Sequence, residues 1–156
     1  MFEPRGHDMM SGAMIYPPHN PENDFSILFI ETSGCLPMCG HGTIGAVTIA
    51  IEEKIINPKK DGVLKIETPA GTIEINYLYE KGKVKWVELT NVESYLCSED
   101  LSIISTELGE INFDVAYGGN FYAIIDYQKN FSGIQNYTAS DIVRYSQEIR
   151  KKINLK

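Results

Sequence analysis

The sequence predicts an α+β fold built from many short strands and two helices. Three observations support this class: short runs of β-branched and aromatic residues alternate with turn signals, one apolar segment has the length and alanine content of a helix, and a second, amphipathic segment lies near the C-terminus. Hydrophobic residues make up 43% and charged residues 22% of the 156, which is typical of a globular chain. At about 100–200 residues per domain, this length predicts one domain.

The expected strands lie between turn residues along most of the chain. Ala13–Tyr16 is a short apolar run closed by two prolines. Phe25–Ile30 is apolar almost throughout and is expected to be buried on both faces. Turns are expected at 69–71, 81–82 and 118–120, each of which contains glycine. The other expected strands are Val63–Glu67, Thr72–Tyr79, Val84–Leu89, Ile111–Tyr117 and Phe121–Tyr127.

Two segments break the strand pattern and are expected to be helices. Gly42–Ile56 is apolar for about two turns and then amphipathic, and Asn57-Pro58 is expected to end it. Because its first half is apolar on nearly every side, this helix is expected to be buried inside a curved sheet. In Thr138–Asn154, either Thr138 or Ser140 can cap the start, Asp141 lies in the first turn and basic residues lie near the end, a charge order that suits the helix dipole. Its expected buried stripe is Ile142, Tyr145, Ile149 and Ile153.

The charge and cysteine content narrow the classes of partner and compartment. With 14 Lys and Arg against 21 Asp and Glu, the net charge is −7, so nucleic acid is not the expected partner, because phosphate binding needs a basic face. No apolar run reaches the ~18–20 residues that span a bilayer, and residues 1–7 lack the apolar stretch of a signal peptide. The 3 cysteines are too few for a disulfide scaffold. These features predict a cytoplasmic protein with no membrane partner.

The stretch from Ser33 to Gly45 carries the most chemical information. Cys39 stands immediately before the glycine-rich start of the first expected helix. Backbone N–H groups at a helix start attract anions, glycines let a ligand approach closely, and the helix dipole favours a thiolate. Cys39 is therefore a candidate reactive thiol beside a site for a carboxylate or phosphate.

Other interpretations of this stretch stay open. One makes Cys39 a small buried hydrophobic residue at a tight turn. Another makes Cys35, Cys39 and His41 zinc ligands, but no second ligand pair follows them, so no metal site is predicted. The Gly-Lys-Ser/Thr of a P-loop is missing. For Cys35 and Cys97, ordinary half-buried thiols are the favoured interpretation.

Four blocks of the sequence, in the same order, resemble those of the proline racemase family, which also includes 4-hydroxyproline 2-epimerases and trans-3-hydroxyproline dehydratases. The blocks are Met1–His7, Met38–Gly45, Thr68–Gly71 and Asp114–Ala123. The resemblance spans nearly the whole chain. It implies a fold similar to diaminopimelate epimerase, an α+β lobe whose curved, mostly antiparallel sheet is wrapped around a central helix, here Gly42–Ile56.

The resemblance also implies an isomerase that acts on proline or 4-hydroxyproline without a metal or pyridoxal cofactor. In the family's two-cysteine mechanism, one thiolate removes the α-proton and a second thiol donates a proton to the opposite face. Carried over residue by residue, Cys39 is one catalytic cysteine, and Gly40 and His41 supply backbone N–H groups to the substrate carboxylate. The resemblance leaves the His41 side chain either a packing role or a polar bridging role.

Ser11 bears on the choice of substrate. Proline racemases resemble one another in having Phe at this position, which offers an apolar wall to an unsubstituted ring. Serine offers a small hydrogen-bonding group instead, which suits a ring hydroxyl. The resemblance therefore favours 4-hydroxyproline over proline, and the alternative is that Ser11 is an ordinary residue before a turn glycine.

Part of the family pattern is missing. The second catalytic cysteine belongs to a D-x-S-P-C-G-T-G-T block, which does not occur in these 156 residues, and Cys97 lacks its glycine and threonine neighbours. The strands that precede the first block in the family are absent as well. Residues 1–156 are therefore expected to form a partial N-terminal lobe, inactive alone, that works with a second lobe or in a homo-oligomer. The alternative is a non-catalytic paralogue that binds a small carboxylate or a partner chain.

Overall fold

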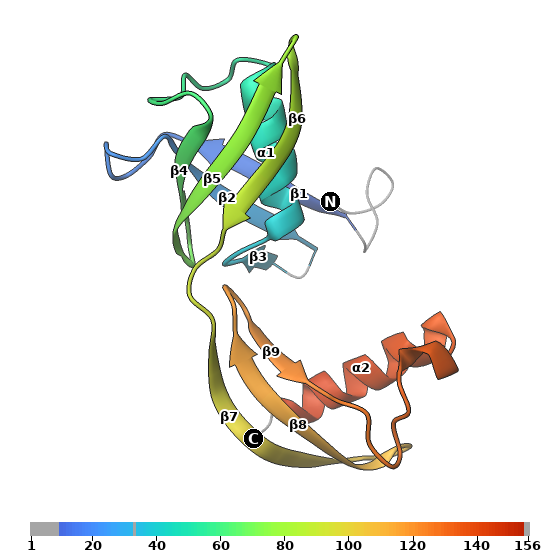
Figure 1. Cartoon of the computed structure of the whole chain (residues 1–156). Helices are drawn as coiled ribbons and strands as arrows, with labels where there is room; N and C mark the ends of the chain where they lie inside the picture. The colour runs from blue at the N-terminus through green and yellow to red at the C-terminus, as the bar shows by residue number, and fades with distance from the viewer. Residues whose placement is uncertain (1–9, 33, 155–156) are drawn as a thin grey trace. The chain divides into compact units, whose positions relative to one another are not determined.

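The computed structural model describes residues 10–32 and 34–154 (Figure 1). The length alone favours one domain, whereas the contacts of the folded chain form two compact units, each with its own apolar core. Unit 1 contains the described residues up to Glu93 together with the turn Gly118–Asn120. Unit 2 contains Ser94–Tyr117 and the residues from Phe121 onward. Neither helix of the described chain has the length and apolar character needed to cross a bilayer.

Unit 1 contains a mixed sheet, in which every strand except β3 lies at or close to a range predicted from the sequence. Its strand order is β1-β2-β4-β5-β6, with the short β3 added beside β2. Within the described residues, neighbouring strands pair antiparallel except β2 and β4, which pair in parallel. The strands are β1 (Ser11–Tyr16), β2 (Phe25–Glu31), β3 (Gly34–Leu36), β4 (Val63–Thr68), β5 (Gly71–Glu80) and β6 (Lys83–Thr90). The prediction did not include β3, because three residues are too few for an alternating pattern.

The hairpin turns of unit 1 lie where the sequence predicts them. Lys81 and Gly82 join β5 to β6 with φ angles of 51° and 79°. Positive φ at both positions is the geometry of a type I′ turn, whose twist matches that of the strands it joins. Glycine adopts this conformation without strain, which explains its place at the second position.

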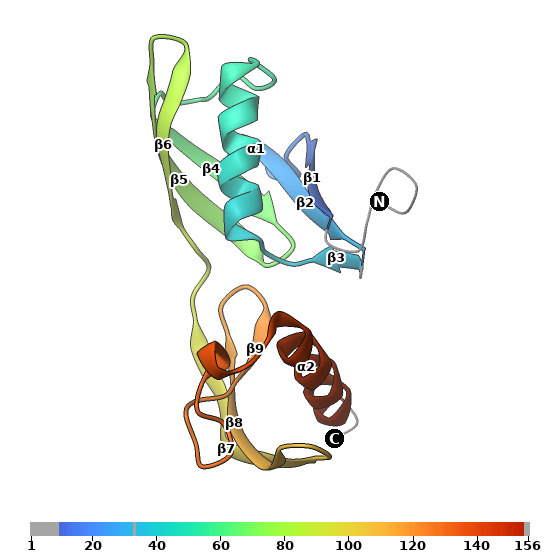
Figure 2. The ribbon, with the colours of Figure 1, turned by 90° about the vertical axis from the view of Figure 1, so that its right-hand side faces the viewer.

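The sheet of unit 1 curves around the helix α1 (Gly40–Glu52), as Figure 2 shows. The edge strands β1 and β6 both contact this helix, so the sheet flanks it on two sides. Alternate residues of the strands point inward, since side chains of a strand alternate between its faces. The buried apolar core of unit 1 consists of Phe25, Ile27, Phe29, Met38, Ala46, Val47, Ile51, Leu64, Ile66, Ile73, Ile75 and Tyr77.

Three predictions for these elements need correction. The helix ends at Glu52 and not at Ile56, and Lys54, with a φ of 53°, has left the helical conformation. Nor is it buried on nearly every side, because Ile44 and Ile49 are 42% and 56% exposed. The predicted burial of both faces of β2 is also wrong, since one face is buried and the other half-buried. The sheet and the helix cover each other's inner faces and leave the other face of each element partly open.

Unit 2 contains a three-stranded antiparallel sheet, among its described residues, in the order β7-β8-β9. Its elements are β7 (Tyr95–Ser105), β8 (Gly109–Tyr117), β9 (Phe121–Ile124), the 3-10 turn η1 (Ile134–Asn136) and α2 (Ala139–Ile153). The strand β7 is absent from the predictions because the polar run Ser98–Asp100 interrupts its apolar residues. Its register with β8 shifts at two places, which interrupts the alternation that marks a strand. The strand β9 stops three residues before the predicted Tyr127.

The helix α2 confirms its predicted start and charge order. Thr138 caps it, accepting a hydrogen bond from the Asp141 N–H, while Asp141 accepts one from the Thr138 N–H. This reciprocal arrangement is a capping box. The predicted stripe faces the sheet, where Ile149 and Ile153 pack against the core of unit 2. The stripe is only half-buried, because none of the described residues of α2 is fully buried.

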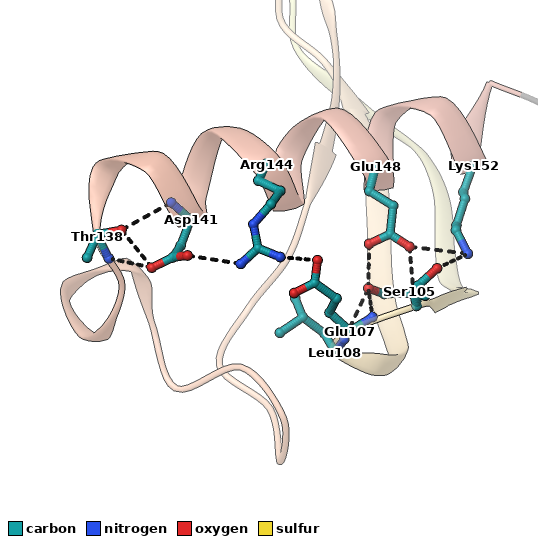
Figure 3. Close-up of polar contacts among 9 residues, drawn as sticks. Ser105, Glu107, Leu108, Thr138, Asp141, Arg144, Glu148 and Lys152 are labelled. Atoms are coloured by element: carbon teal, nitrogen blue, oxygen red, sulfur yellow. Dashed lines mark hydrogen bonds and ion pairs between the residues drawn. The ribbon is translucent and has the colours of Figure 1, made fainter.

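Polar contacts also tie α2 to the β7–β8 hairpin (Figure 3). The Glu148 carboxylate accepts hydrogen bonds from the Thr106 N–H at 2.6 Å and from Ser105 Oγ at 2.9 Å. Lys152 Nζ lies 3.3 Å from that carboxylate and donates to the Ile104 carbonyl at 2.6 Å. These donors, chiefly Thr106, lower the pKa of Glu148 to about 2. The charged form of Glu148 therefore stabilises unit 2.

This arrangement predicts an acid-sensitive unit 2. Because the pKa of Glu148 in the folded chain is below its ordinary value of 4.5, its stabilisation is complete above about pH 4.5 and is lost as the pH falls toward 2. We expect the wild-type free energy of unfolding, from urea titrations followed by circular dichroism, to fall more steeply across this range than that of Glu148→Gln. Glu110→Gln, a change on an exposed residue of β8, is the matched control. If the free energy of unfolding falls with pH equally steeply in wild type and Glu148→Gln, charged Glu148 does not stabilise unit 2.

Candidate functional site

Cys39 occupies the N-cap of α1, immediately before its first helical residue. Its φ and ψ of −145° and 108° are extended, and its carbonyl accepts hydrogen bonds from the Thr43 N–H at 2.9 Å and from Thr43 Oγ1 at 2.8 Å. The Cys39 side chain makes no capping hydrogen bond and is half-buried. The sequence places a thiol where most helices have a capping oxygen, which leaves the sulfur available for chemistry.

Backbone N–H groups at the first turn of α1 have the polarity that attracts an anion. N–H groups of a helix's first turn have no intrahelical acceptor, and the first intrahelical bond here is that of Thr43. Gly40 is exposed, and a Cβ built on it would come no closer than 3.8 Å to Leu89. The N–H groups of Gly40 and His41 therefore lie in the positive end of the helix dipole, where a carboxylate is stabilised.

A groove of about 500 Å³ runs along α1 on the side of β1 and β2. Ser11, Cys39 and His41 all line it, so the structure brings together three of the four residues singled out from the sequence. Gly40 is not among the lining residues, although it precedes His41 in the same turn. The rest of the lining is mainly apolar or small, which suits the ring of a small amino acid.

The thiol and the imidazole within this groove lie side by side. Cys39 Sγ is 3.6 Å from His41 Nδ1 and 3.9 Å from Nε2. Gly42 lies between the sulfur and Phe29, because a Cβ built on it would be 3.2 Å from Cys39 Sγ and 3.1 Å from the Phe29 ring. A larger residue at 42 would push either the sulfur or the ring away. The glycine therefore allows the close approach of helix, strand and thiol.

The segment that leads into Cys39 is held by two other family-like blocks. The Ala70 N–H donates to the Pro37 carbonyl at 3.2 Å, and Asn120 Nδ2 donates to the Met38 carbonyl at 2.7 Å. Asn91 Nδ2 in turn donates to the Gly118 carbonyl at 2.9 Å. Sequence reasoning missed Asn120 as a positioning residue, although it belongs to the block Asp114–Ala123. The position of Asn120 in a block that resembles the family could have identified it.

The remaining candidates lie elsewhere. Cys35 and Cys97 are exposed, not half-buried as predicted, and neither lines the groove. The described part of the chain contains no cluster of three or more His, Cys, Asp or Glu side chains able to hold a metal ion. The block Met1–His7 lies outside the described residues.

Comparison with known proteins gives close relatives. The chain is 55% identical over 154 residues to the 4-hydroxyproline 2-epimerase of Spirosoma linguale, covering 99% of this chain and 46% of that protein. It is 54% identical to the probable 4-hydroxyproline 2-epimerase of Rhizobium meliloti, covering 100% and 47%. The chain thus spans about half the length of the curated relatives it matches.

Solved structures agree with the fold. A hydroxyproline epimerase from Agrobacterium vitis, with bound trans-4-hydroxy-L-proline, matches with a TM-score of 0.74 and 30% identity over 81% of this chain and 37% of that one. A PhzF-family protein from Bacillus anthracis matches with a TM-score of 0.52 and 15% identity over 76% and 42% of the two chains, which bears on the fold alone. The α+β, diaminopimelate epimerase-like fold expected from the sequence is thereby confirmed.

The match to a protein family extends over the whole chain. The family named Proline racemase matches residues 1–156, and so includes the thiol at the start of α1, the groove beside it and the blocks that hold it. Together with relatives that are more than half identical, this match shows that the chain belongs to the proline racemase family.

Proposed function

We propose that this chain is the Cys39-bearing part of a 4-hydroxyproline 2-epimerase, an isomerase that inverts the α-carbon without a cofactor. The observation that carries the proposal is the position of Cys39 Sγ, which lines a groove at the N-terminus of α1. A carboxylate bound to the N–H groups of Gly40 and His41 would have its α-carbon beside that sulfur. The names of the close relatives support the same reaction.

Removal of an α-proton requires both a base, here a thiolate, and groups that stabilise the resulting negative charge, here a helix N-terminus. Removing the α-proton of an amino acid leaves negative charge that spreads into the carboxylate. Fixed N–H groups and the helix dipole stabilise that charge without reorganising, so they favour the ionised form over the substrate. The Cys39 thiolate accepts the proton, and a second thiol on the opposite face returns one, which inverts the centre.

The second thiol is proposed to come from outside these 156 residues. The D-x-S-P-C-G-T-G-T block is absent from the sequence, and Cys35 is exposed and does not line the groove. We propose that residues 1–156 act as part of the first lobe and that a second lobe or another chain supplies the opposite acid. The absent block also favours a second function, in which the groove only binds a small carboxylate.

Ser11 is proposed to meet the ring hydroxyl of the substrate. It lies at the start of β1 and lines the same groove as Cys39. A hydroxyl group here gives a hydroxylated ring a hydrogen-bond partner that an unsubstituted ring cannot use. The solved relative from Agrobacterium vitis has trans-4-hydroxy-L-proline bound, which supports this substrate over proline.

The carboxylate site is tested by removing one N–H group. In Gly40→Pro the ring replaces the hydrogen at the first helical position, where proline is well tolerated, and Cys39 already has the extended backbone that precedes proline. We expect pyrrole-2-carboxylate, a planar mimic of the ionised substrate, to bind this variant about 10- to 100-fold more weakly than wild type, because a hydrogen bond to a charged group is lost. Calorimetry or NMR titration measures the difference.

Gly40→Ala is the matched control, because it adds a side chain and keeps the N–H group. Its Cβ has only an ordinary contact with Leu89, so we expect affinity close to that of wild type. Equal affinities for all three proteins, or no binding of pyrrole-2-carboxylate by wild type, would refute the carboxylate site.

A further inference from the structure

The Met38 carbonyl, one residue before Cys39, is held from a distant part of the chain. It accepts a hydrogen bond of 2.7 Å from Asn120 Nδ2, 82 residues further along the sequence. Because a peptide bond is planar, the Met38 carbonyl and the Cys39 N–H belong to one rigid unit. Asn120 therefore fixes the orientation of the peptide that leads into Cys39.

The peptide on the other side of Cys39 is fixed as well. The Cys39 carbonyl accepts hydrogen bonds from the Thr43 N–H at 2.9 Å and from Thr43 Oγ1 at 2.8 Å, and Thr43 is fully buried. The Cys39 side chain, by contrast, makes no capping hydrogen bond. With both neighbouring peptides fixed, the backbone sets the direction of the Cα–Cβ bond, and the sulfur has only a few staggered positions from there.

The turn that carries Asn120 packs tightly on the same segment. Gly118–Asn120 belongs to unit 1, and a Cβ built on Gly119 would lie 2.6 Å from Met38 Cβ. The Met38 side chain is 3% exposed and belongs to the core, so it has no room to move away from the turn. Asn91 Nδ2 donates to the Gly118 carbonyl at 2.9 Å and so holds the turn itself in place.

We propose that Asn120 is a positioning residue, which holds the Cys39 sulfur beside the N–H groups of Gly40 and His41. The inference rests on the proposed function, in which a carboxylate binds those N–H groups and the sulfur meets the carbon next to it. A carboxylate and its α-carbon are one bond apart, so the sulfur must lie within a narrow range of positions. A displacement of about 1 Å can cost about 100-fold in rate.

Two reagents that differ in charge test this alignment. Iodoacetate and iodoacetamide both alkylate a thiolate, which forms a carbon–sulfur bond at the CH2 group and releases iodide. Iodoacetate has a carboxylate next to that carbon, as the substrate does, whereas iodoacetamide is neutral. The ratio of the two rates at one cysteine does not depend on its thiolate fraction, because both reagents need the thiolate. Divided by the same ratio at the exposed Cys97, it measures how well the carboxylate site directs a reagent to Cys39.

The two rates are measured by mass spectrometry of peptides from the full 156-residue chain. In wild type we expect Cys39 to prefer iodoacetate about 10- to 100-fold more than Cys97 does, as a hydrogen bond to a charged group would give. Asn120→Leu has nearly the same shape and no donor, so we expect its preference to fall to within about threefold of that of Cys97. Its affinity for pyrrole-2-carboxylate should stay within about threefold of wild type, because the N–H groups that bind the carboxylate belong to the helix.

Asn76→Leu is the matched control, because it makes the same change at an exposed position of β5 in unit 1. We expect it to keep the wild-type preference and affinity. If Asn120→Leu keeps the preference for iodoacetate, Asn120 does not position the sulfur, while the proposed function stands. If Asn120→Leu also loses affinity for pyrrole-2-carboxylate, Asn120 maintains the whole site and the positioning role is overturned. If wild-type Cys39 has no preference beyond that of Cys97, the proposed function fails together with this inference.

Discussion

Incubated with trans-4-hydroxy-L-proline in D2O, the purified 156-residue chain is expected to produce no C2 epimer. Inversion requires a base on one face of the α-carbon and an acid on the other. Cys39 lines the groove and is proposed to supply one of these groups, whereas Cys35 and Cys97 do not line it. Chiral chromatography and proton NMR of the recovered amino acid measure the epimer and the deuterium content at the α-carbon.

Ligand binding must be shown in the same sample, so that a failure to bind is not mistaken for a failure to invert the α-carbon. Pyrrole-2-carboxylate binding serves as this control. Accumulation of the epimer by wild type, and its loss in Cys39→Ala, would show that the chain contains a second acid. Cys35→Ala and Cys97→Ala would then identify that acid.

Replacing Phe29 by alanine is expected to destabilise unit 1 by about 3–5 kcal/mol, the usual cost of emptying a fully packed aromatic site. The Phe29 side chain is 2% exposed and belongs to the core of unit 1. Its ring also lies against the first turn of α1 at Gly42. The cavity would therefore open beside Cys39, and ligand affinity should fall together with stability.

The measurement uses the fluorescence of Trp86, which is the single tryptophan of the chain and lies on β6 of unit 1. Urea titrations followed at this residue report the unfolding of unit 1. Leu28→Ala is the control, because Leu28 neighbours Phe29 on the half-buried face of β2. If Phe29→Ala lowers the free energy of unfolding of unit 1 no more than Leu28→Ala does, the Phe29 ring does not anchor the helix.

Local features of the chain were predictable because short-range physics decides them. The capping box at Thr138 and Asp141 needs only residues three apart, and the turn at Lys81-Gly82 needs only backbone freedom at two positions. Cys39 before a glycine-rich helix start was recognisable for the same reason. These features require no knowledge of what packs against them.

The features that the sequence did not predict depend on contacts between distant segments. The strand β7 contains the polar run Ser98–Asp100 and is a strand because it pairs with β8, which no local pattern records. The helix α1 is apolar beyond what the sheet covers, so periodicity overstated its burial at Ile44 and Ile49. The exposure of a residue depends on its neighbours in space, and those neighbours come from distant parts of the chain.

By itself, the sequence determined the α+β class, most elements and the family, and it singled out Cys39 as the candidate thiol. Only the tertiary structure decided which residues share the groove with that thiol. The pairing of β1 with β2 brings Ser11 opposite Glu31, and the curvature of the sheet around α1 brings both to the side of Cys39. Strand register and sheet curvature arise from packing between distant segments, because burial of one face of the sheet allows one register and excludes the next.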